Sequence, residues 1–421
     1  MQVQLNKNWK TKFFSIWIGQ AFSLLGSQIV QFTLIWYLTK ETGSATVLAT
    51  STLVSLLPNV LLAPFIGALV DRWDRKRIMI IADLLIALVT LILILLFRVG
   101  KIQIWHIYLA MFLREFGSTF HWPSMRSSTS LLVPKENMAR VEGMNQTIRG
   151  LLNVVGPPLA AILLDLTDIH NILAIDIITA FLAVTPLLFV AIPQPAQDQT
   201  DNAKSASSLL QDMKLGFRYL KNWKGMLLLT FTATLINFLV NPGFTLTPLL
   251  VTQHFQGGAF QLSLVESVFG IGVISGGVLL STWGGFKKRI LTTITAIIGM
   301  GGAILLIAFA SPSQFNLALA GMLLTGFTNP IVNGSITAIM QTNVKPEMQG
   351  RVFTTLNSLA NAMSPFSMLI AAPVAEIIGI QGWFLVGGLG CIIMGIFGLL
   401  NPDLMNIEEE GQRRQQAEKA S

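Results

Sequence analysis

Long apolar runs separated by short polar segments follow one another along the whole chain. A membrane-spanning helix needs about 20 mostly apolar residues, and twelve runs reach about that length. We predict spanning helices over 13–37, 46–70, 78–99, 103–125, 144–165, 170–192, 225–252, 260–283, 290–311, 315–340, 350–378 and 382–401. The pattern therefore predicts an all-α membrane protein with twelve transmembrane helices.

Composition agrees with lipid as the surroundings of this chain. Of the 421 residues, 52% are hydrophobic and 12% are charged, about half the charged fraction of a soluble domain. The single cysteine, Cys391, lies in an apolar run, which excludes a disulfide framework and a cysteine-ligated metal site. The G-x-x-x-x-G-K-[ST], H-E-x-x-H and G-x-S-x-G motifs do not occur in the sequence, so we expect no direct use of ATP, no cofactor and no enzymatic activity.

The basic residues of the predicted loops are concentrated on one side of the membrane. With the N-terminus placed in the cytoplasm, only Lys40, Arg98 and Lys101 fall in outer loops, and most other Lys and Arg residues fall in inner ones. The positive-inside rule then predicts that both termini are cytoplasmic. Most of the formal charge of +7 faces anionic membrane lipid, so nucleic acid is not an expected partner.

The longest polar break covers residues 193–224 and separates two halves of six spans each. Within it, apolar residues from Leu209 to Leu220 recur at helical spacing, which predicts an amphipathic helix on the cytoplasmic membrane face. The predicted segments are an N-terminal half at 1–192, a cytoplasmic linker at 193–224, a C-terminal half at 225–401 and a cytoplasmic tail at 402–421.

The two halves repeat each other in one of their loops. Gly67-Ala-Leu-Val-Asp-Arg-Trp73, followed by Arg75-Lys-Arg-Ile78, corresponds to Gly277-Val-Leu-Leu-Ser-Thr-Trp283, followed by Lys287-Lys-Arg-Ile290. A repeat of about half the chain in the same orientation indicates two parallel, pseudo-symmetric halves, related by an axis along the membrane normal.

The loop from Gly67 to Arg77 resembles the major facilitator signature G-x-x-x-D-(R/K)-x-G-R-(R/K)-x, with Asp74 at the usual glycine. Arg114 with Gly117 resembles the embedded arginine motif of that superfamily. The whole chain is similar to the macrolide-efflux branch of drug:proton antiporters. This similarity is carried by Ile16-Trp-Ile-Gly-Gln20, Leu38-Thr-Lys-Glu-Thr-Gly-Ser44, Phe120-His-Trp-Pro123 and Gly350-Arg-Val-Phe353.

The resemblance implies a monomeric transporter with the major facilitator fold in the inner membrane of a bacterium, surrounded by membrane lipid. It implies that the chain exchanges amphipathic drugs such as macrolides for protons by alternating access. Relatives in the same branch export siderophores or move lysophospholipids, so export or flipping of an endogenous solute is the alternative function. A receptor that does not transport is a further alternative.

The signature loop is the conformational gate that the resemblance implies, made by Gly67, Asp71, Arg72, Arg75 and Lys76. In the family this acid approaches the N-terminus of the eleventh span in one state only, and a carboxylate is favoured beside the positive end of a helix. Such a contact biases the alternating equilibrium. The alternative is that the basic residues only hold this loop in the cytoplasm.

Four ionisable residues within the spans are candidates for proton coupling: Arg114, Glu115, Asp176 and Glu266. Ionisable groups at such depth cost at least about 2.5 kcal/mol each, so they normally face a cavity. Glu115 is the first candidate for protonation, because burial disfavours a charged carboxylate. A structural ion pair is the alternative for Glu115, and a solvated position near the outer surface is the alternative for Asp176 and Glu266. Asp83 is expected to brace the basic loop, and His121 to bond neighbouring helices.

Polar amides on apolar helices are the candidates for the substrate cavity, and bonds between helices are the alternative role for each of them. These residues are Gln28, Gln31, Asn237, Asn241, Asn329, Asn333 and Asn361. Together with aromatic residues, they suit a large, apolar, weakly basic solute.

Glycine and proline residues in the fifth and eighth spans predict a helix seam between the halves that opens and closes. The residues are Gly150, Gly156, Pro157, Gly272 and Gly276. Proline kinks a helix because it removes a backbone donor, and a GxxxG pair lets two helices approach closely. A static packing seam is the alternative.

Overall fold

The computed structural model describes residues 9–192 and 206–419, and in these ranges it contains helices and no strand. Several side chains within the helices, among them those of Asp71, Arg72 and Asn361, lie outside the described residues. The prediction of an all-α protein is confirmed. The chain forms two compact units, Met1–Thr42 with Thr50–Ala206 (unit 1) and Gly43–Ala49 with Ser207–Ser421 (unit 2).

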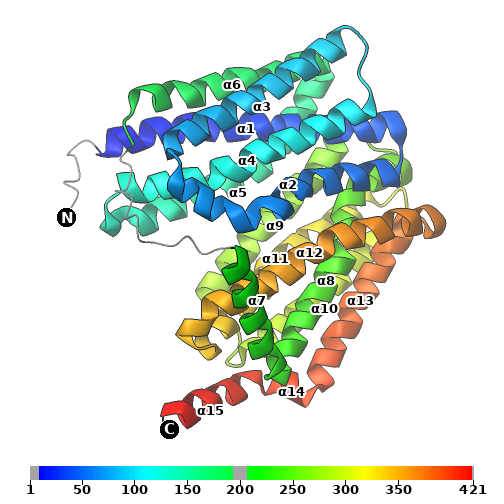
Figure 1. The fold of residues 1–421 in the computed structure, drawn as a ribbon. Helices are drawn as coiled ribbons and strands as arrows, with labels where there is room; N and C mark the ends of the chain where they lie inside the picture. Colours follow the sequence, from blue (N-terminus) through cyan, green and yellow to red (C-terminus); the bar gives the residue numbers. More distant parts are fainter. Residues whose placement is uncertain (1–8, 193–205, 420–421) are drawn as a thin grey trace. The chain divides into compact units, whose positions relative to one another are not determined.

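Unit 1 is built from the first six long helices of the described chain (Figure 1). They are α1 (Trp9–Thr42), α2 (Ala45–Arg72), α3 (Arg75–Arg98), α4 (Ile104–Leu132), α5 (Met138–Leu166) and α6 (Ile169–Phe189). A 3-10 turn, Lys135–Asn137, precedes α5. The first residues of α2 group with unit 2.

Unit 2 contains the remaining helices of the described chain. They are α7 (Ala206–Lys221), α8 (Lys224–Leu249), α9 (Ala259–Trp283), α10 (Arg289–Phe309), α11 (Phe315–Asn343), α12 (Pro346–Ile378), α13 (Ile380–Leu400), α14 (Pro402–Met405) and α15 (Ile407–Lys419). A π-helical turn, Leu250–His254, continues α8. The helix predicted within the linker is present as α7, and α15 gives the predicted tail a helical structure.

Eleven helices in the described ranges are long and apolar enough to cross a membrane. Helix α4 has 29 residues but is not among them, because it carries Arg114, Glu115 and His121. Two of these polar residues, Arg114 and Glu115, are the ones that the sequence singled out for function.

The same four helix pairs pack together in each unit, which confirms the predicted pseudo-symmetric halves. In unit 1 the packed pairs are α1 with α6, α3 with α4, α3 with α6 and α1 with α5. In unit 2 the corresponding pairs are α8 with α13, α10 with α11, α10 with α13 and α8 with α12. In these pairs, five spans of the first half (α1, α3, α4, α5 and α6) thus have a counterpart six spans later with the corresponding neighbours.

Exposed surfaces of the long helices are apolar, as lipid requires. On α3, the side chains of Ile81, Leu88 and Leu95 are 65%, 55% and 54% exposed. The polar residues Asp83 and Thr90 of the same helix are 4% and 0% exposed. Contiguous apolar surface of this kind marks contact with a membrane, and the polar groups lie inside the helix bundle.

Asp74 explains how the signature loop departs from the family pattern without losing its turn. Its side-chain Oδ1 accepts a hydrogen bond of 3.0 Å from the backbone N–H of Arg77, so Asp74 is the N-cap of α3. Aspartate is among the best N-cap residues, because its oxygen satisfies a backbone donor that the first helical turn leaves open. The corresponding turn of unit 2 uses Gly284 and Gly285, whose φ angles are +76° and +86°.

Candidate functional site

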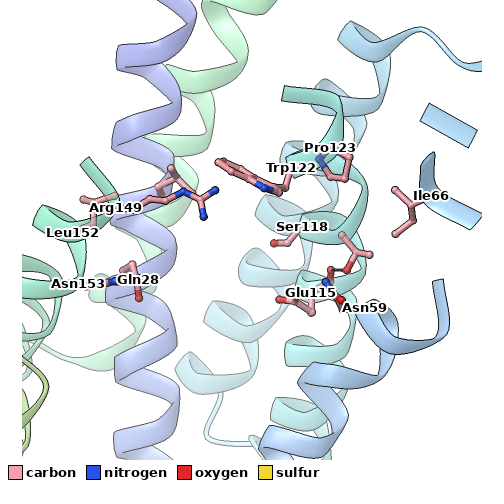
Figure 2. A pocket seen from close by; sticks show the side chains of 12 residues that line it. Gln28, Asn59, Ile66, Glu115, Ser118, Trp122, Pro123, Arg149, Leu152 and Asn153 are labelled. Carbon is pink, nitrogen blue, oxygen red and sulfur yellow. Dashed lines mark hydrogen bonds between the residues drawn. The ribbon is translucent and has the colours of Figure 1, made fainter. Parts of the chain in front are cut away.

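Unit 1 contains a cavity of about 600 Å³ (Figure 2). Helices α1, α2, α4 and α5 supply its lining, with Gln28, Asn59, Glu115, Trp122 and Arg149 among the lining residues. A second space of about 300 Å³ shares Gln28 and Glu115 with it. The volume is that of a typical small-molecule pocket.

Glu115 is the acidic residue of this cavity. Its side chain is half-buried, and no ion pair to its carboxylate is found among the described residues. The other predicted lining residues of unit 1, Gln28 and Gln31, also lie on these walls. Gln28 donates a 3.0 Å hydrogen bond from Nε2 to Asn153 Oδ1, which links α1 to α5.

An arginine on α5 stacks on an indole of α4 at the lining of the cavity. The Arg149 guanidinium carbon lies 3.4 Å from the centroid of the Trp122 ring. Such a cation–π contact is worth about 0.5–1 kcal/mol when exposed and more when desolvated. The cavity therefore combines a carboxylate, a guanidinium, an aromatic ring and several amides, and Arg149 and Trp122 were not among the predicted site residues.

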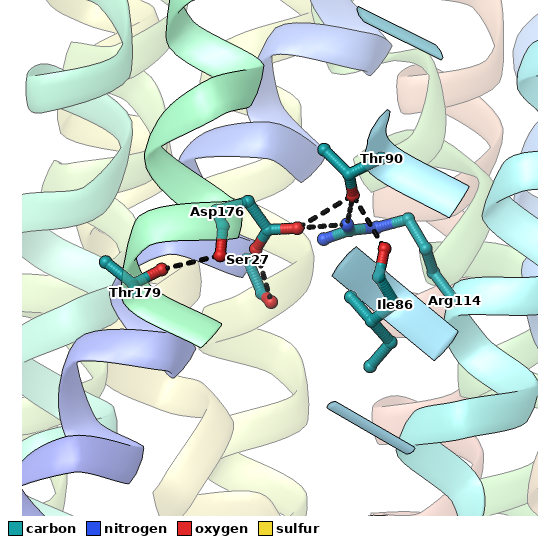
Figure 3. A network of polar contacts seen from close by, with 6 residues as sticks. All are labelled: Ser27, Ile86, Thr90, Arg114, Asp176 and Thr179. Atoms are coloured by element: carbon teal, nitrogen blue, oxygen red, sulfur yellow. Dashed lines mark hydrogen bonds and ion pairs between the residues drawn. The ribbon is translucent and has the colours of Figure 1, made fainter. Parts of the chain in front are cut away.

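Arg114 belongs to a buried polar cluster (Figure 3), and it borders the smaller space of about 300 Å³. The guanidinium pairs with the carboxylate of Asp176 on α6 and donates to the hydroxyl of Thr90 on α3. The Thr90 and Ser27 hydroxyls lie 2.9 Å and 3.1 Å from the two Asp176 carboxylate oxygens. Asp176 is 1% exposed and Arg114 is 7% exposed, so the charges are desolvated and compensate each other.

Two alternatives from the sequence are thereby decided. Asp176 is buried between helices, so the solvated position near the outer surface is wrong for this residue. The structural ion pair considered for Glu115 is made instead by its neighbour Arg114. Successive helix positions point about 100° apart, so the guanidinium of Arg114 reaches Asp176 while Glu115 lines the larger cavity, and both residues border the smaller space.

Asp83 and His121 form a second buried cluster with Gln20. Asp83 Oδ2 accepts a 3.1 Å hydrogen bond from Gln20 Nε2, and Asp83 Oδ1 lies 3.5 Å from His121 Nε2. The expectation that Asp83 braces the basic loop is wrong, because its described contacts are with α1 and α4. The contact of His121 with α3 agrees with the expected role between helices.

In unit 2, the predicted cavity amides bond along their own helices. Asn237 donates to the Ala233 carbonyl at 2.9 Å, and Asn333 donates to the Asn329 carbonyl at 3.1 Å. Asn241 lies 3.5 Å from the Asn237 side chain. Glu266, on α9, is half-buried. Their part in substrate or proton binding stays a prediction, and Asn361 lies outside the described side chains.

The glycines of α9 pack this helix within its own unit. A Cβ atom at Gly272 would meet the backbone carbonyl of Leu323, and one at Gly276 would meet that of Phe327, both on α11. Within unit 2, the close helix contact that requires glycine is therefore with the tenth span, and the seam with the fifth span stays a prediction for this pair. On α5, a Cβ at Gly156 would lie 3.3 Å from Gln28 Cβ on α1. Gly150 and Pro157 lie on the same helix.

The gate residues are described only in part. Arg75 is 6% exposed, and Lys76 donates a 3.0 Å hydrogen bond from Nζ to the Leu188 carbonyl at the end of α6. The side chains of Asp71 and Arg72, and the surroundings of Gly67, lie outside the described residues. The gating role therefore stays a prediction.

Comparison with known proteins identifies the class. Residues 16–367 match the model of the Major Facilitator Superfamily. The chain belongs to this superfamily, so it is a multi-pass membrane transporter and not an enzyme.

The relatives are more specific than the superfamily. Macrolide efflux protein A of Streptococcus pyogenes is 35% identical over 390 residues, which cover 92% of this chain and 95% of that protein. Macrolide efflux protein A of Enterococcus faecalis is 33% identical over 327 residues, covering 77% and 100%. The predicted resemblance to the macrolide-efflux branch is confirmed.

Solved structures support the fold. A bacterial homologue of the iron transporter ferroportin, in an inward-facing state, superimposes with a TM-score of 0.70 at 14% identity. The superposition covers 92% of this chain and 98% of that one. At this level of identity the likeness concerns the fold alone.

Proposed function

We propose that this transporter exports amphipathic, weakly basic drugs such as macrolide antibiotics across a bacterial cytoplasmic membrane in exchange for protons. It does so as a monomer by alternating access, with both termini in the cytoplasm. The names of its relatives in two bacteria support drug efflux. The observation that carries the proton coupling is the carboxylate of Glu115 in a cavity of about 600 Å³, without a described ion-pair partner.

Glu115 couples the two fluxes because it binds either a proton or a cationic drug. With a proton on the carboxylate, the group is neutral and does not hold an ammonium group. When a cationic drug enters, its charge favours the ionised carboxylate, and the proton leaves. The face of Trp122 offers stacking surface to the apolar body of the same drug.

The Arg114–Asp176 pair holds the fourth span in register while Glu115 changes charge. Because Asp176 already compensates Arg114, Arg114 is not available to neutralise Glu115, and the other charged group on the cavity lining is Arg149, which lies over the Trp122 ring. Separating α4 from α6 would leave an uncompensated buried charge, so the pair favours keeping these two helices together.

The signature loop supplies the conformational bias. Asp71, Arg72, Arg75 and Lys76 form a gate whose contacts exist in one state of the transport cycle and shift the equilibrium between states. Residues 1–192 and 225–401 are the two halves that move, and residues 193–224 connect them on the cytoplasmic side.

The test uses inside-out vesicles with an acidified lumen. Macrolides, dyes and lysophospholipids are added in turn while the pH gradient is monitored. Wild type is compared with Glu115→Gln and Asp71→Asn, and with Glu136→Gln, which removes an exposed acid of the 3-10 turn in the same unit. We expect a macrolide to discharge the gradient in wild type and Glu136→Gln, and not in Glu115→Gln.

Two other outcomes of the vesicle assay would change the proposed function. Discharge by lysophospholipids alone would favour the flipping of an endogenous lipid over drug export. If no compound changes the gradient while the folded protein is present in the vesicles, antiport is refuted.

A further inference from the structure

The two buried clusters of unit 1 are built from residues seven positions apart on three helices. On α1 the residues are Gln20 and Ser27, on α3 they are Asp83 and Thr90, and on α4 they are Arg114 and His121. Seven residues of an α-helix advance about 10 Å, close to two turns, so each helix presents both residues on one face. The clusters are therefore two polar layers stacked along the same helix bundle.

The layers differ in charge. The layer of Arg114 and Asp176 contains one cation and one anion, so it is neutral. The layer of Asp83 and His121 contains one carboxylate and an imidazole, and it is neutral only when His121 carries a second proton. The side chains of His121 and Asp83 are 12% and 5% exposed. With a neutral imidazole, the Asp83 carboxylate is therefore a buried charge without compensation, which is costly.

The charged groups around Asp83 and His121 are consistent with a site that binds one proton. The charged groups on the helices that form or pack against this layer are Lys10, Lys12, Lys40 and Glu41 on α1, Arg75, Lys76, Arg77, Asp83 and Arg98 on α3, Arg114, Glu115 and Arg126 on α4, Arg140, Glu142, Arg149 and Asp165 on α5, and Asp176 on α6. Among the described contacts, Arg114 pairs with Asp176, and Arg126 lies 3.9 Å from Glu142. The direct contact of Asp83 with a titratable group is the one with His121.

A small cavity of about 30 Å³ borders this layer. Its lining includes Gln20 and His121 at one point and Arg126 and Asn145 at another. The space has room for at least one water molecule, and the amides and the imidazole supply polar partners for it. Because α4 enters unit 1 at Ile104 and ends at Leu132, Arg126 lies beyond His121 toward the end of α4, which is cytoplasmic in the proposed orientation.

We propose that Asp83 and His121 form a second proton-binding site, through which the coupled proton leaves toward the cytoplasm. A proton is taken up on Nε2 of neutral His121, and the resulting imidazolium pairs with the Asp83 carboxylate. Loss of that proton to a water in the small cavity restores the starting state. This inference rests on the proposed proton coupling, and it assigns the exit step to residues other than Glu115.

The first test measures the protonation of His121 without any transport. The protein, labelled with ¹⁵N-histidine and held in lipid nanodiscs, is titrated from about pH 5 to pH 9. The chain has four histidines, so His121→Gln identifies the His121 signal by its loss, and His170→Gln serves as the matched control. We expect His121 to titrate in this range.

Asp83→Asn then decides whether the carboxylate sets that titration. Removing an opposite charge within about 4–6 Å lowers the midpoint of an imidazole by roughly 1–3 pH units, and the amide keeps the shape of the side chain. A His121 signal that does not titrate, or that keeps its midpoint in Asp83→Asn, overturns the proposal and leaves a purely structural contact.

The second test separates proton release from drug binding. In vesicles, proton-driven drug transport by His121→Gln is expected to fall by at least about tenfold, the lower range for a lost proton-transfer group. Exchange of labelled for unlabelled drug needs no net proton movement and is expected to stay within about twofold of wild type. Equal losses in both assays would indicate a structural role and overturn the proposal.

The outcomes also distinguish this inference from the proposed function. If no drug discharges the gradient in wild type, proton-coupled drug export fails, and the histidine titration still reports on the Asp83–His121 site. If drugs discharge the gradient equally in wild type and His121→Gln, antiport stands and the exit site is refuted.

Discussion

Replacing Asp176 with asparagine should destabilise unit 1 more than any other isosteric change in its spans. The substitution removes the counter-charge of Arg114, which is 7% exposed and cannot turn to solvent without opening the packing of α3, α4 and α6. Removing one partner of a buried ion pair costs about 3–5 kcal/mol, because the other charge stays buried and uncompensated. We therefore expect Asp176→Asn to lower the free energy of unfolding of unit 1 by about 3–5 kcal/mol.

The matched variants are Arg114→Gln and the double variant. If the cost arises from an unpaired charge, Arg114→Gln with Asp176→Asn removes both charges and recovers most of the stability that either single variant loses. The coupling energy of this cycle should then exceed about 2 kcal/mol, at the upper end of values for groups in contact.

The assay follows each unit by its own reporter during thermal unfolding in detergent. Hydrogen exchange of the α3 and α4 amides reports on unit 1, and the reaction of the buried thiol of Cys391 with a fluorogenic reagent reports on unit 2. We expect early exchange in α3 and α4 of Asp176→Asn, with a fall of more than about 5 °C in the unfolding midpoint. An unchanged midpoint in Asp176→Asn, or a double variant no more stable than the singles, would refute the assignment of the stability to this pair.

Three further predictions concern packing, capping and pH. Gly276→Ala places a Cβ against the backbone of α11 and should lower the free energy of unfolding by about 1–3 kcal/mol, measured as faster reaction of the Cys391 thiol in unit 2. The control is Gly277→Ala, where the space is open, and it should be neutral or slightly stabilising. Asp74→Ala should cost about 1 kcal/mol of helix capping, and Asp74→Gly, which restores the family residue, only a few tenths, both measured as shifts in the unfolding midpoint. The hydrogen bond from Lys288 lowers the pKa of the exposed Glu409 carboxyl. The contact therefore stabilises the position of α15 at pH values above the usual carboxyl pKa. This stabilisation is lost as the pH falls through the lowered pKa of Glu409. Hydrogen exchange of α15 should accordingly rise at acid pH in wild type, and it should be raised already at pH 7, to a similar extent, in Glu409→Gln.

The fold could be predicted almost completely, because the physical constraint on it is simple. Length and polarity of each run determine whether it crosses a membrane, and the repeat between Gly67 and Gly277 indicates parallel halves. The C-terminal helix α15 was missed as a helix, since it is polar throughout and has no apolar stripe. Its position depends on single contacts, such as the 3.2 Å hydrogen bond from the Ile290 backbone N–H to Glu408.

The site could be predicted only in its residue types. Arg114, Glu115 and Asp176 are conspicuous because charges are costly in lipid, but cost alone does not reveal which charges meet. Asp83 was assigned to the nearby basic loop because proximity in sequence was the available signal, while its described contacts are 63 and 38 residues away, at Gln20 and His121. The spacing of seven residues on α1, α3 and α4 was a signal in the sequence that could have indicated two layers.

Two adjacent charged residues of α4 have different surroundings. Arg114 and Glu115 follow each other, so the guanidinium of Arg114 reaches Asp176 while Glu115 lines the larger cavity. Arg114 borders the smaller space together with Glu115, but its charge is already compensated by Asp176, so it has no ion pair with Glu115 among the described contacts. Because Asp176 holds Arg114 inside the bundle, the carboxylate of Glu115 stays available to a proton or to a drug. In the proposed mechanism, the buried pair is therefore what keeps Arg114 from neutralising the acidic residue that exchanges a proton for a drug.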